Sequence, residues 1–461
     1  MHFDQHFIKG IVPDAAIPFA TFPDDVSFSV DTRTLTSGNI FVAISGAQVD
    51  GHNYLKQALE KNASGLFIAA DKKHLLKDLD QNLLKNKLVI IVQDTMQAFI
   101  KLACAWRNQF NYPVVGITGS VGKTSTKEMI KNILRLNGTQ FIASEGNQNT
   151  RVGLAMNLFK MRDHHQVAIF ELGISKRGEM CELAKIVRPT TAVITGIGHA
   201  HMEGLGSLAD IAIEKRDIFK YFEQNSIGII NGDQALLSHV GYAHPMIKFG
   251  VKTINQIQAR KIQASGSHIA CTFKIYKEKF VINFQNPHEG VVFNALAATA
   301  VTYLLNVPTA KIVEGIQLPL TVTGRFEEKN LASRPGKIIH DCYNANPESM
   351  KAALLAFQKI ETKAQKIAVL GDMLELGVNS PFWHRQLGRF LRKVPSLKHL
   401  ILVGDMVKWT YKTVPVGITV DVVPTWKEAV SKLEERLGQE SVVLVKGSRG
   451  LALENLVQKF T

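Results

Sequence analysis

The stretch Val114–Thr124, VVGITGSVGKT, decides the fold of this chain. It opens with a short β-rich run, Val114–Thr118, and apolar residues recur every three or four positions in the segment Lys127–Leu136 that follows. That spacing predicts a helix, so the glycines lie between a strand and a helix. A glycine-rich turn in this context is typical of a loop that binds nucleotide phosphates.

The residue types in this loop suit phosphate chemistry. Gly119 and Gly122 let backbone N–H groups approach phosphate oxygens, and the N-terminus of the helix adds the positive end of its dipole. Lys123 can reach the β- and γ-phosphates, and the Thr124 hydroxyl can bind Mg²⁺. Because Ile117 stands where the strict pattern G-x-x-x-x-G-K-[ST] requires glycine, the loop has the shorter form G-x-x-G-K-T. A chance glycine turn is the weaker alternative, and we predict an ATP or GTP site.

Three side chains that follow later strands are candidate metal ligands. Glu171 comes directly after the strand predicted at Val167–Phe170, and a carboxylate beside a phosphate loop suits Mg²⁺. An ordinary acid at the end of a strand is the alternative. His199 and His201 follow another predicted strand, but the regular ligand spacing of a zinc site is absent. A structural role for the two histidines therefore stays open.

Lys215 lies on the apolar face of the helix predicted over Ser207–Phe222. The apolar residues of that face are Leu208, Ile211, Ala212, Phe219 and Phe222. A lysine that points inward should have a lowered pKa. Its neutral amine could act as a base or nucleophile, or take up CO₂ as a carbamate that binds metal. The alternative is a lysine that buries its stem and keeps its charge in water.

Length and composition limit the class of protein. The chain has 461 residues, 46% of them hydrophobic and 20% charged, which is a globular composition with room for about three domains. Lys and Arg number 54 against 40 Asp and Glu, and the net charge of +14 suits anionic partners. The four cysteines lie far apart, which argues against a disulfide framework and favours a reducing compartment.

The chain shows no targeting or membrane-spanning segment. Its N-terminus lacks a basic region followed by an apolar core, and no run of about 18 uncharged apolar residues occurs. We expect a cytoplasmic protein without a membrane span, and a monomer.

The pattern of apolar runs and polar turns along the sequence predicts three α/β domains. Residues 1–85 mix short apolar runs with polar turns and predict a small α/β unit. Residues 86–317 hold the phosphate loop in a parallel-sheet domain, with a β-ribbon predicted at 252–286. Residues 318–461 alternate strands and helices, which is typical of a Rossmann-like parallel sheet with helices on both faces. The linker at 317–325 contains Pro319 and Gly324 and is a plausible hinge.

Several motifs resemble the Mur ligase family, which comprises ATP-dependent amide-bond-forming ligases of peptidoglycan synthesis. The motifs are Tyr343–Met350 (YNANPESM), Gly371–Gly377 (GDMLELG), Lys446–Arg449 (KGSR), Asp31–Arg33, Gly38–Ala43 and Asp50–His52. The resemblance covers essentially the whole chain. It is strongest to the MurF type, whose members join D-alanyl-D-alanine to UDP-N-acetylmuramoyl-tripeptide. The shortened phosphate loop is the form usual in that family.

The resemblance implies roles for individual residues. It implies ATP contacts from Gly119, Ser120, Val121, Gly122, Lys123, Thr124, Ser125, Asn294, Arg325, Asp341 and Asn344, with His288 in the stretch near adenine. It implies contacts to two Mg²⁺ ions from Thr124, Glu171, His201 and a carbamylated Lys215. It implies catalytic roles for Lys123, Lys215 and His201, and contacts to the UDP end from Thr32, Arg33, Asp50 and His52. The chain departs from the usual family pattern at Thr150, Gly196 and His340.

The implied reaction, EC 6.3.2.10, serves cell-wall biogenesis, and with it cell shape and division. A substrate carboxylate attacks the γ-phosphate of ATP, and an amine then displaces phosphate from the acyl phosphate. One alternative is a sibling ligase that adds a single amino acid or glutamate, as in MurE-like or folylpolyglutamate-like enzymes. Another is a basic nucleic-acid-binding P-loop protein, but no cluster of basic and aromatic residues was found to support it. We expect no nucleic acid partner.

Overall fold

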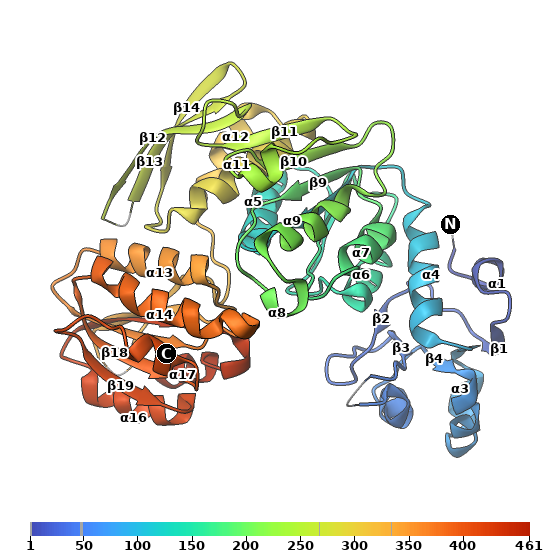
Figure 1. The fold of residues 1–461 in the computed structure, drawn as a ribbon. Helices are drawn as coiled ribbons and strands as arrows, with labels where there is room; N and C mark the ends of the chain where they lie inside the picture. Colours follow the sequence, from blue (N-terminus) through green and yellow to red (C-terminus); the bar gives the residue numbers. More distant parts are fainter. Residues whose placement is uncertain (1, 47–48, 267, 333) are drawn as a thin grey trace. The chain divides into compact units, whose positions relative to one another are not determined.

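The computed structural model describes residues 2–46, 49–266, 268–332 and 334–461 (Figure 1). The chain is an α/β protein with three sheets of five, nine and six strands. It divides into two compact units. The first unit comprises Met1–Gly116, Gln140–Gly173 and Cys181–Thr190, and the second comprises Ile117–Thr139, Ile174–Met180 and Thr191–Thr461.

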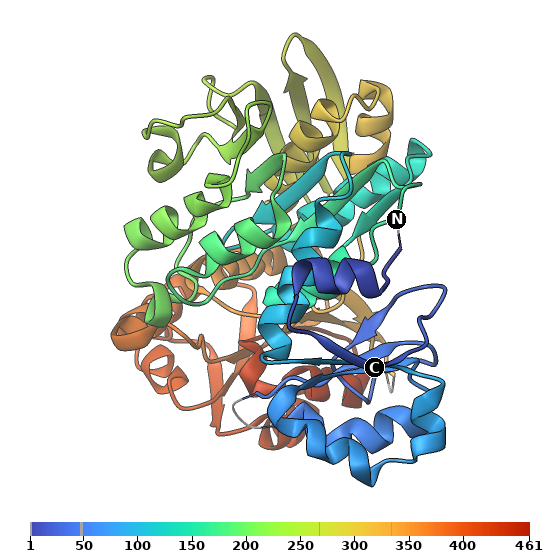
Figure 2. The same ribbon diagram turned by 90° about the vertical axis from the view of Figure 1, so that its right-hand side faces the viewer.

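A five-stranded sheet forms the N-terminal part of the first unit. In pairing order its strands are β1 (Ala16–Ala20), β5 (Leu88–Val92), β4 (Gly65–Ala69), β3 (Ile40–Val42) and β2 (Phe28–Ser29). All pairs are parallel except β1 with β5. The short helices beside it, which face the viewer in Figure 2, are α1 (Gln5–Ile11), α2 (Leu55–Glu60) and α3 (Gln81–Lys85). Because β5 is fully buried in this sheet, the sheet continues past the domain boundary expected at residue 85.

A cluster of aromatic rings joins this sheet to the rest of the first unit. Its rings come from the N-terminal segment, from β2, from α4 (Thr95–Arg107) and from the end of α6 (Arg151–Leu158). Phe159 lies with its ring centroid 4.3 Å from that of Phe28 and 5.3 Å from that of Phe99. Such ring pairs add about 0.5–1.5 kcal/mol each beyond the burial of their area. The strands β7 (Phe141–Ala143) and β8 (Val167–Glu171) pair in parallel in the same unit.

The second unit begins at the phosphate loop, between β6 (Val114–Thr118) and α5 (Lys123–Leu136). Its parallel strands are β9 (Thr191–Ile194), β10 (Ile227–Asn231) and β11 (Met246–Gly250). The predicted β-ribbon is confirmed as β12 (Ile257–Ser265), β13 (His268–Ile275) and β14 (Glu278–Phe284). The helix α5 packs against α11 (Gly290–Leu304) and α12 (Thr309–Ile316). Shorter helices of this unit are α8 (Met202–Leu205) and α10 (Ala235–Ser238), whereas α7 (Glu179–Val187) lies mostly in the first unit.

The six-stranded C-terminal sheet confirms the alternation of strands and helices predicted from residue 318 onward. In pairing order its strands are β15 (Glu327–Asn330), β16 (Gly336–Asp341), β20 (Ser441–Lys446), β17 (Gln365–Gly371), β18 (Leu397–Val403) and β19 (Thr419–Val423). One core holds α13 (Pro347–Lys359), α14 (Ser380–Phe390) and α15 (Val407–Tyr411). A separate core holds α16 (Trp426–Arg436) and α17 (Glu454–Phe460), so each face of the sheet has its own helical layer (Figure 1).

The helix predicted over Ser207–Phe222 is shorter in the structure. The α-helix α9 spans Leu208–Arg216, and a 3₁₀ turn at Asp217–Phe219 follows it. Ser207 caps its start, since its hydroxyl accepts from the N–H of Asp210 while the Asp210 carboxylate accepts from the N–H of Ser207. The apolar spacing continued past the helix because the 3₁₀ turn keeps Phe219 buried.

Asp372, in the GDMLELG motif, organises the loop after β18. Its carboxylate is 4% exposed and accepts hydrogen bonds from the backbone N–H groups of Asp405, Met406 and Val407, at 2.7 to 3.1 Å. A buried carboxylate with three backbone donors is well compensated for the loss of water. This residue therefore supports the fold of the C-terminal sheet.

We expect Asp372→Ala to lower the stability of the C-terminal domain by about 2–4 kcal/mol, because three backbone N–H groups, of which that of Val407 is buried, lose their acceptor. Asp405→Ala is the matched control, since Asp405 is exposed and only its backbone is used. Urea unfolding followed by circular dichroism measures both variants. Equal midpoints for the two would contradict this account of Asp372.

Candidate active site

The phosphate loop is shaped by two glycines with left-handed backbone conformations. Gly119 has φ +149° and Gly122, which begins α5, has φ +86°. A Cβ on Gly119 would overlap the Thr195 hydroxyl, and a Cβ on Gly122 would overlap the side chain of Asn294. Both positions therefore require glycine, because neither the backbone conformation nor the space accepts a side chain.

Hydrogen bonds from the loop to the segment after β9 fix its course. Ser120 donates from its backbone N–H to the carbonyl of Gly196 at 2.8 Å and from its hydroxyl to the carbonyl of Gly198 at 2.9 Å. The Thr195 hydroxyl donates to the carbonyl of Val121 at 2.5 Å. Lys123 folds back over the loop and donates to the carbonyl of Gly119 at 2.8 Å. The loop is thus organised for a phosphate before any ligand binds.

A cavity of about 410 Å³ lies beside this loop, entirely within the second unit. It brings together nine of the eleven residues predicted to bind ATP. They are Ser120, Val121, Gly122, Lys123, Ser125, Asn294, Arg325, Asp341 and Asn344, and His201 and His288 also line the cavity. Gly119 and Thr124 belong to the loop but are not in the lining. A cavity of this size suits a small polyphosphate ligand.

Arg325 links the C-terminal domain to the phosphate loop. Its Nη2 donates to the Thr124 hydroxyl at 2.9 Å, and its guanidinium lies 4.1 Å from the centre of the Tyr343 ring. Among the described residues, its buried Nε has no hydrogen-bond partner. A guanidinium with a donor to spare beside a cavity is suited to bind an anion.

Lys446, from the KGSR motif, also lines the cavity. Its Nζ forms an ion pair with the Asp341 carboxylate at 2.8 Å and donates to the carbonyl of Asn344 at 3.1 Å. The other carboxylate oxygen of Asp341 accepts from the N–H of Phe326 at 3.2 Å. The motif was recognised from the sequence, but its lysine was given no role, because the partner lies on a distant strand.

The two histidines after β9 contact acids of the C-terminal domain. The Glu348 carboxylate accepts from the backbone N–H of His199 at 3.0 Å and also contacts its imidazole. His201 forms an ion pair with Glu375 at 2.5 Å, and this contact lowers the pKa of the Glu375 carboxyl. The Glu375 carbonyl also accepts from the N–H of Glu203 at 3.0 Å. Glu348 and Glu375 lie in recognised motifs but had not been singled out.

Lys215 points into the protein, as its register on the helix predicts. Its side chain is 1% exposed, so the alternative in which it keeps its charge in water is wrong. Burial holds its pKa well below the usual value, and the nearby charge of Lys123 lowers it further. The adjacent Glu214 opposes this shift, while its carboxylate accepts from the N–H groups of Gly178 and Met180.

Glu171 lies in the first unit, at the end of β8, and is 1% exposed. Asn149 donates to its carboxylate at 3.1 Å, and the N–H of Glu171 donates to the Ser144 hydroxyl at 3.0 Å. Thr150 caps the start of α6, since its hydroxyl accepts from the N–H of Gly153. This capping explains the departure at Thr150, because Asn and Thr both serve as N-caps.

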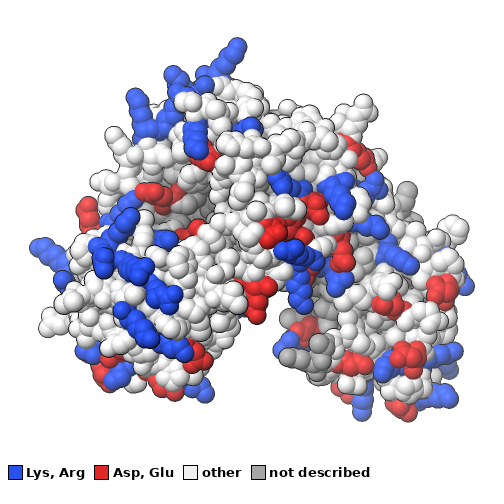
Figure 3. All heavy atoms as spheres, viewed as in Figure 1, with Lys and Arg blue, Asp and Glu red and all other residues white. Residues whose placement is uncertain are grey.

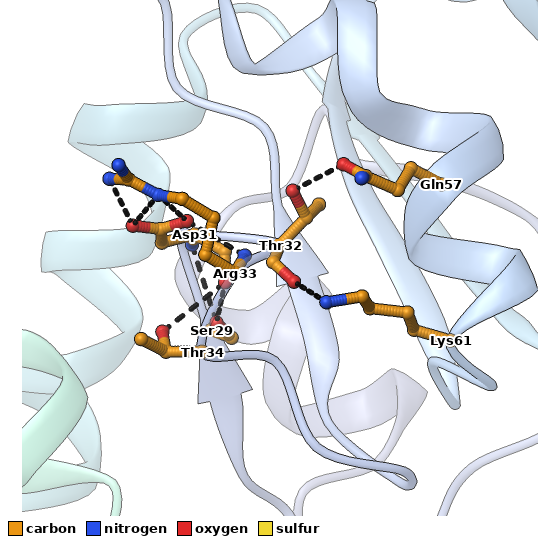
Figure 4. Close-up of polar contacts among 7 residues, drawn as sticks. All are labelled: Ser29, Asp31, Thr32, Arg33, Thr34, Gln57 and Lys61. Carbon is orange, nitrogen blue, oxygen red and sulfur yellow. Dashed lines mark hydrogen bonds and ion pairs between the residues drawn. The ribbon is translucent and has the colours of Figure 1, made fainter.

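The residues expected at the UDP end also lie in the first unit, and Figure 4 shows two of them, Thr32 and Arg33. Arg33 is paired with Asp31, and its Nη2 lies 2.6 Å from that carboxylate while most of the side chain stays in solvent. The Thr32 hydroxyl donates to Gln57 at 2.6 Å, and Lys61 donates to the Thr32 carbonyl at 2.6 Å (Figure 4). The loop is ordered by its own contacts and exposes a guanidinium.

His52 is buried, and both of its ring nitrogens are engaged. Its Nε2 accepts from the N–H of Ala69 at 3.0 Å, so its Nδ1 carries the proton and donates to Asp50 at 2.6 Å. Burial would raise the pKa of Asp50, but hydrogen bonds from the backbone and ring of His52 and from Ser45 outweigh it and lower the pKa to about 2. In this structure His52 joins the Asp50 loop to β4.

Relatives of known function match nearly the full length of the chain. It is 31% identical to the UDP-N-acetylmuramoyl-tripeptide–D-alanyl-D-alanine ligase of Bacillus subtilis, over 93% of this chain and 92% of that protein. The ligase of the same description from Treponema pallidum is 32% identical over 94% and 93%. The chain belongs to the Mur ligase family. Three descriptions within the family match it: the catalytic domain at residues 27–107, the middle domain at 117–302 and the glutamate ligase domain at 324–449.

Solved structures of Mur ligases agree with the fold. MurF from Acinetobacter baumannii superposes with a TM-score of 0.83 at 26% identity, over 99% of this chain and 98% of that one. MurF from Thermotoga maritima in complex with ADP superposes with a TM-score of 0.78 at 25% identity, over 94% and 96%. The three sheets therefore match the N-terminal, middle and C-terminal domains of Mur ligases.

No group of three or more His, Cys, Asp or Glu in the described ranges is arranged to hold a metal ion. Within the same part of the chain, no helix is both long and apolar enough to cross a membrane.

We expect Lys215→Met to raise the melting temperature at neutral pH, by about 2–4 °C for each kcal/mol gained, because it removes a buried amine. The lowered pKa means that the unfolded chain binds one more proton than the folded chain between that pKa and 10.5. The free energy of unfolding of the wild-type protein therefore rises with pH as the cost of burying Lys215 disappears. The difference in melting temperature between the variant and the wild type should shrink toward pH 10.5. Lys220→Met, on the exposed surface after α9, is the control. A variant less stable than wild type at neutral pH would contradict the prediction.

Proposed function

We propose that this chain joins D-alanyl-D-alanine to UDP-N-acetylmuramoyl-tripeptide, with conversion of ATP to ADP and phosphate. Relatives that carry this description align over more than nine-tenths of the chain. The observation that carries the proposal is the cavity in which the phosphate loop meets Asn294, Arg325 and Asp341. ATP binding is supported further by the family and by the ADP complex of the Thermotoga maritima relative.

In the first step a carboxylate oxygen of the tripeptide attacks the γ-phosphorus of ATP. The bond from phosphorus to the bridging oxygen breaks, and ADP leaves with an acyl phosphate remaining. Lys123 and the N–H groups of the loop from Gly119 to Gly122 neutralise charge on the transferred phosphoryl group, where most catalysis of this class arises. Arg325, which already contacts Thr124, adds a second cation to the site.

In the second step the amine of D-alanyl-D-alanine attacks the acyl carbon. A tetrahedral intermediate forms, loses a proton from nitrogen, and expels inorganic phosphate as the amide bond forms. Because an acyl phosphate reacts with water, the site must exclude solvent. The contacts of His199 and His201 with Glu348 and Glu375 support a role for the C-terminal domain in covering the site.

The donor set is compatible with Mg²⁺, which takes few protein oxygens and completes its shell with water and phosphate oxygens. In the second unit, Thr124, His201 and a carbamate on Lys215 are the residues that would hold Mg²⁺, and Glu171 is a further candidate ligand in the first unit. The ions would supply positive charge to the transferring phosphoryl group. His201 lines the cavity and the Thr124 hydroxyl belongs to the loop, which supports the assignment of both.

The UDP end of the substrate would bind in the N-terminal domain. Thr32 and Arg33 bind the UDP end, and the exposed guanidinium of Arg33 is suited to a diphosphate, while Asp50 and His52 shape the adjoining loop. We propose domain boundaries near residues 85 and 317, with the first adjusted to keep β5 in the N-terminal domain. We also propose a cytoplasmic location, where ATP and the UDP-linked substrate are made available.

The deciding experiment supplies the purified protein with ATP, Mg²⁺ and UDP-N-acetylmuramoyl-tripeptide, and compares D-alanyl-D-alanine with single amino acids. We expect one phosphate released per pentapeptide formed, and only with the dipeptide. Lys123→Ala should reduce the rate at least about 1,000-fold while the fold is retained, and Lys131→Ala, on the outer part of the same helix, should not. Phosphate release with single amino acids alone would indicate a sibling ligase instead.

A separate measurement tests the carbamate. The neutral amine of Lys215 can add to CO₂, with a new N–C bond and release of one proton. We expect a carbamate carbon signal in the NMR spectrum of protein incubated with ¹³C-bicarbonate, and its absence in Lys215→Met. If the wild-type and variant spectra are the same, the carbamate proposal is wrong, whatever the ligase activity.

A further inference from the structure

The two helical layers of the C-terminal sheet differ in charge. One layer, here called the basic face, consists of α13, α14, the 3₁₀ turn Leu391–Lys393 and α15, which pack into a common core. It carries one acid, Glu348, and seven basic residues: Lys351, Lys359, Arg385, Arg389, Arg392, Lys393 and Lys408. The opposite layer, α16 and α17, carries four basic residues and four acids.

The charges of the basic face are mostly uncompensated. No acid occurs between Glu375 and Asp405 in the sequence, and Glu348 is already engaged by His199. Among the described residues, Lys359 is the one basic residue of this face with an ion pair, to Glu289. Figure 3 shows Lys and Arg side chains gathered over the region that α13 and α14 occupy in Figure 1.

Aromatic rings lie among these cations. The Trp409 ring has the Arg385 guanidinium 5.0 Å from its centre and the Lys412 ammonium 4.4 Å from it. The Phe390 ring has the ammonium groups of Lys351 and Lys393 at 5.8 and 5.5 Å. Phe382 on α14 and Tyr411 on α15 are 46% and 54% exposed, so apolar rings also reach solvent.

We infer that the basic face docks on the surface of an anionic lipid membrane. Each Lys or Arg near such a surface is attracted by its negative potential, and exposed aromatic rings favour the interfacial layer. Such docking requires several Lys and Arg side chains on one surface, each of which contributes a modest attraction. The basic face has this arrangement. Docking on the surface needs no membrane-spanning segment.

A nucleic acid fits this surface less well. Single strands bind by stacking bases on free ring faces, within a basic groove. The rings of Trp409 and Phe390 already have cations over them, so their faces are in use. Arg389, Arg392 and Lys393 are exposed and do not line the nucleotide cavity. These three basic residues therefore lie outside the ligase site, although α13 of the same layer contributes Glu348, Ser349 and Ala352 to the cavity lining.

The test is sedimentation of the full-length protein with lipid vesicles. We expect binding to vesicles that contain phosphatidylglycerol, weaker binding at high salt, and no binding to pure phosphatidylcholine. The variant R389E/R392E/K393E should bind at least about 100-fold more weakly, since three attractive charges become repulsive. The variant K427E/K432E on α16 should bind as wild type does, and both variants should keep ligase activity with soluble substrates.

Three outcomes would overturn the inference. The first is wild-type protein that does not sediment with phosphatidylglycerol vesicles. The second is equal binding by R389E/R392E/K393E and K427E/K432E, which would mean that net charge rather than this face is responsible. The third is tight, salt-sensitive binding to single-stranded RNA that outcompetes the vesicles, which would assign the face to nucleic acid. Circular dichroism of each variant verifies that its fold is intact.

Discussion

The lack of space around two glycines is the constraint on which the site depends. Gly119 and Gly122 lie against Thr195 and Asn294 so closely that no Cβ fits, and their backbone conformations are those that glycine alone adopts readily. The loop is therefore fixed by β9 on one side and α11 on the other. Its N–H groups keep their direction without a ligand, which is the preorganisation that phosphoryl transfer requires.

The C-terminal domain reaches this loop through charged side chains. Arg325 contacts Thr124, while Glu348 and Glu375 engage the histidines after β9. Apolar contacts accompany these polar ones, since Met202 packs against the core of the C-terminal domain and the His199 ring lies 4.2 Å from the ring of Trp383. The same domain carries the basic face, whose exposed residues Arg389, Arg392 and Lys393 do not line the cavity.

Lys215 shows how far sequence reasoning extends. Its place on an apolar helical face is a local property, and the structure bears it out with a side chain that is 1% exposed. The end of its helix was predicted too late, because a 3₁₀ turn continues the apolar spacing after Arg216. The basic and aromatic cluster on α14 and α15 was overlooked, because its members are separated along the chain and meet only through packing of the two helices.

The sequence by itself determined the phosphate loop, the alternation of strands and helices, and the family, because each is written in residues close together in the chain. The tertiary structure alone decided which groups meet across long separations. Glu348 lies 149 residues from His199, and the main chain between Asp341 and Lys446 is 105 residues long. Such pairs depend on the order of strands in a sheet and on the layering of helices, and neither is encoded by local spacing.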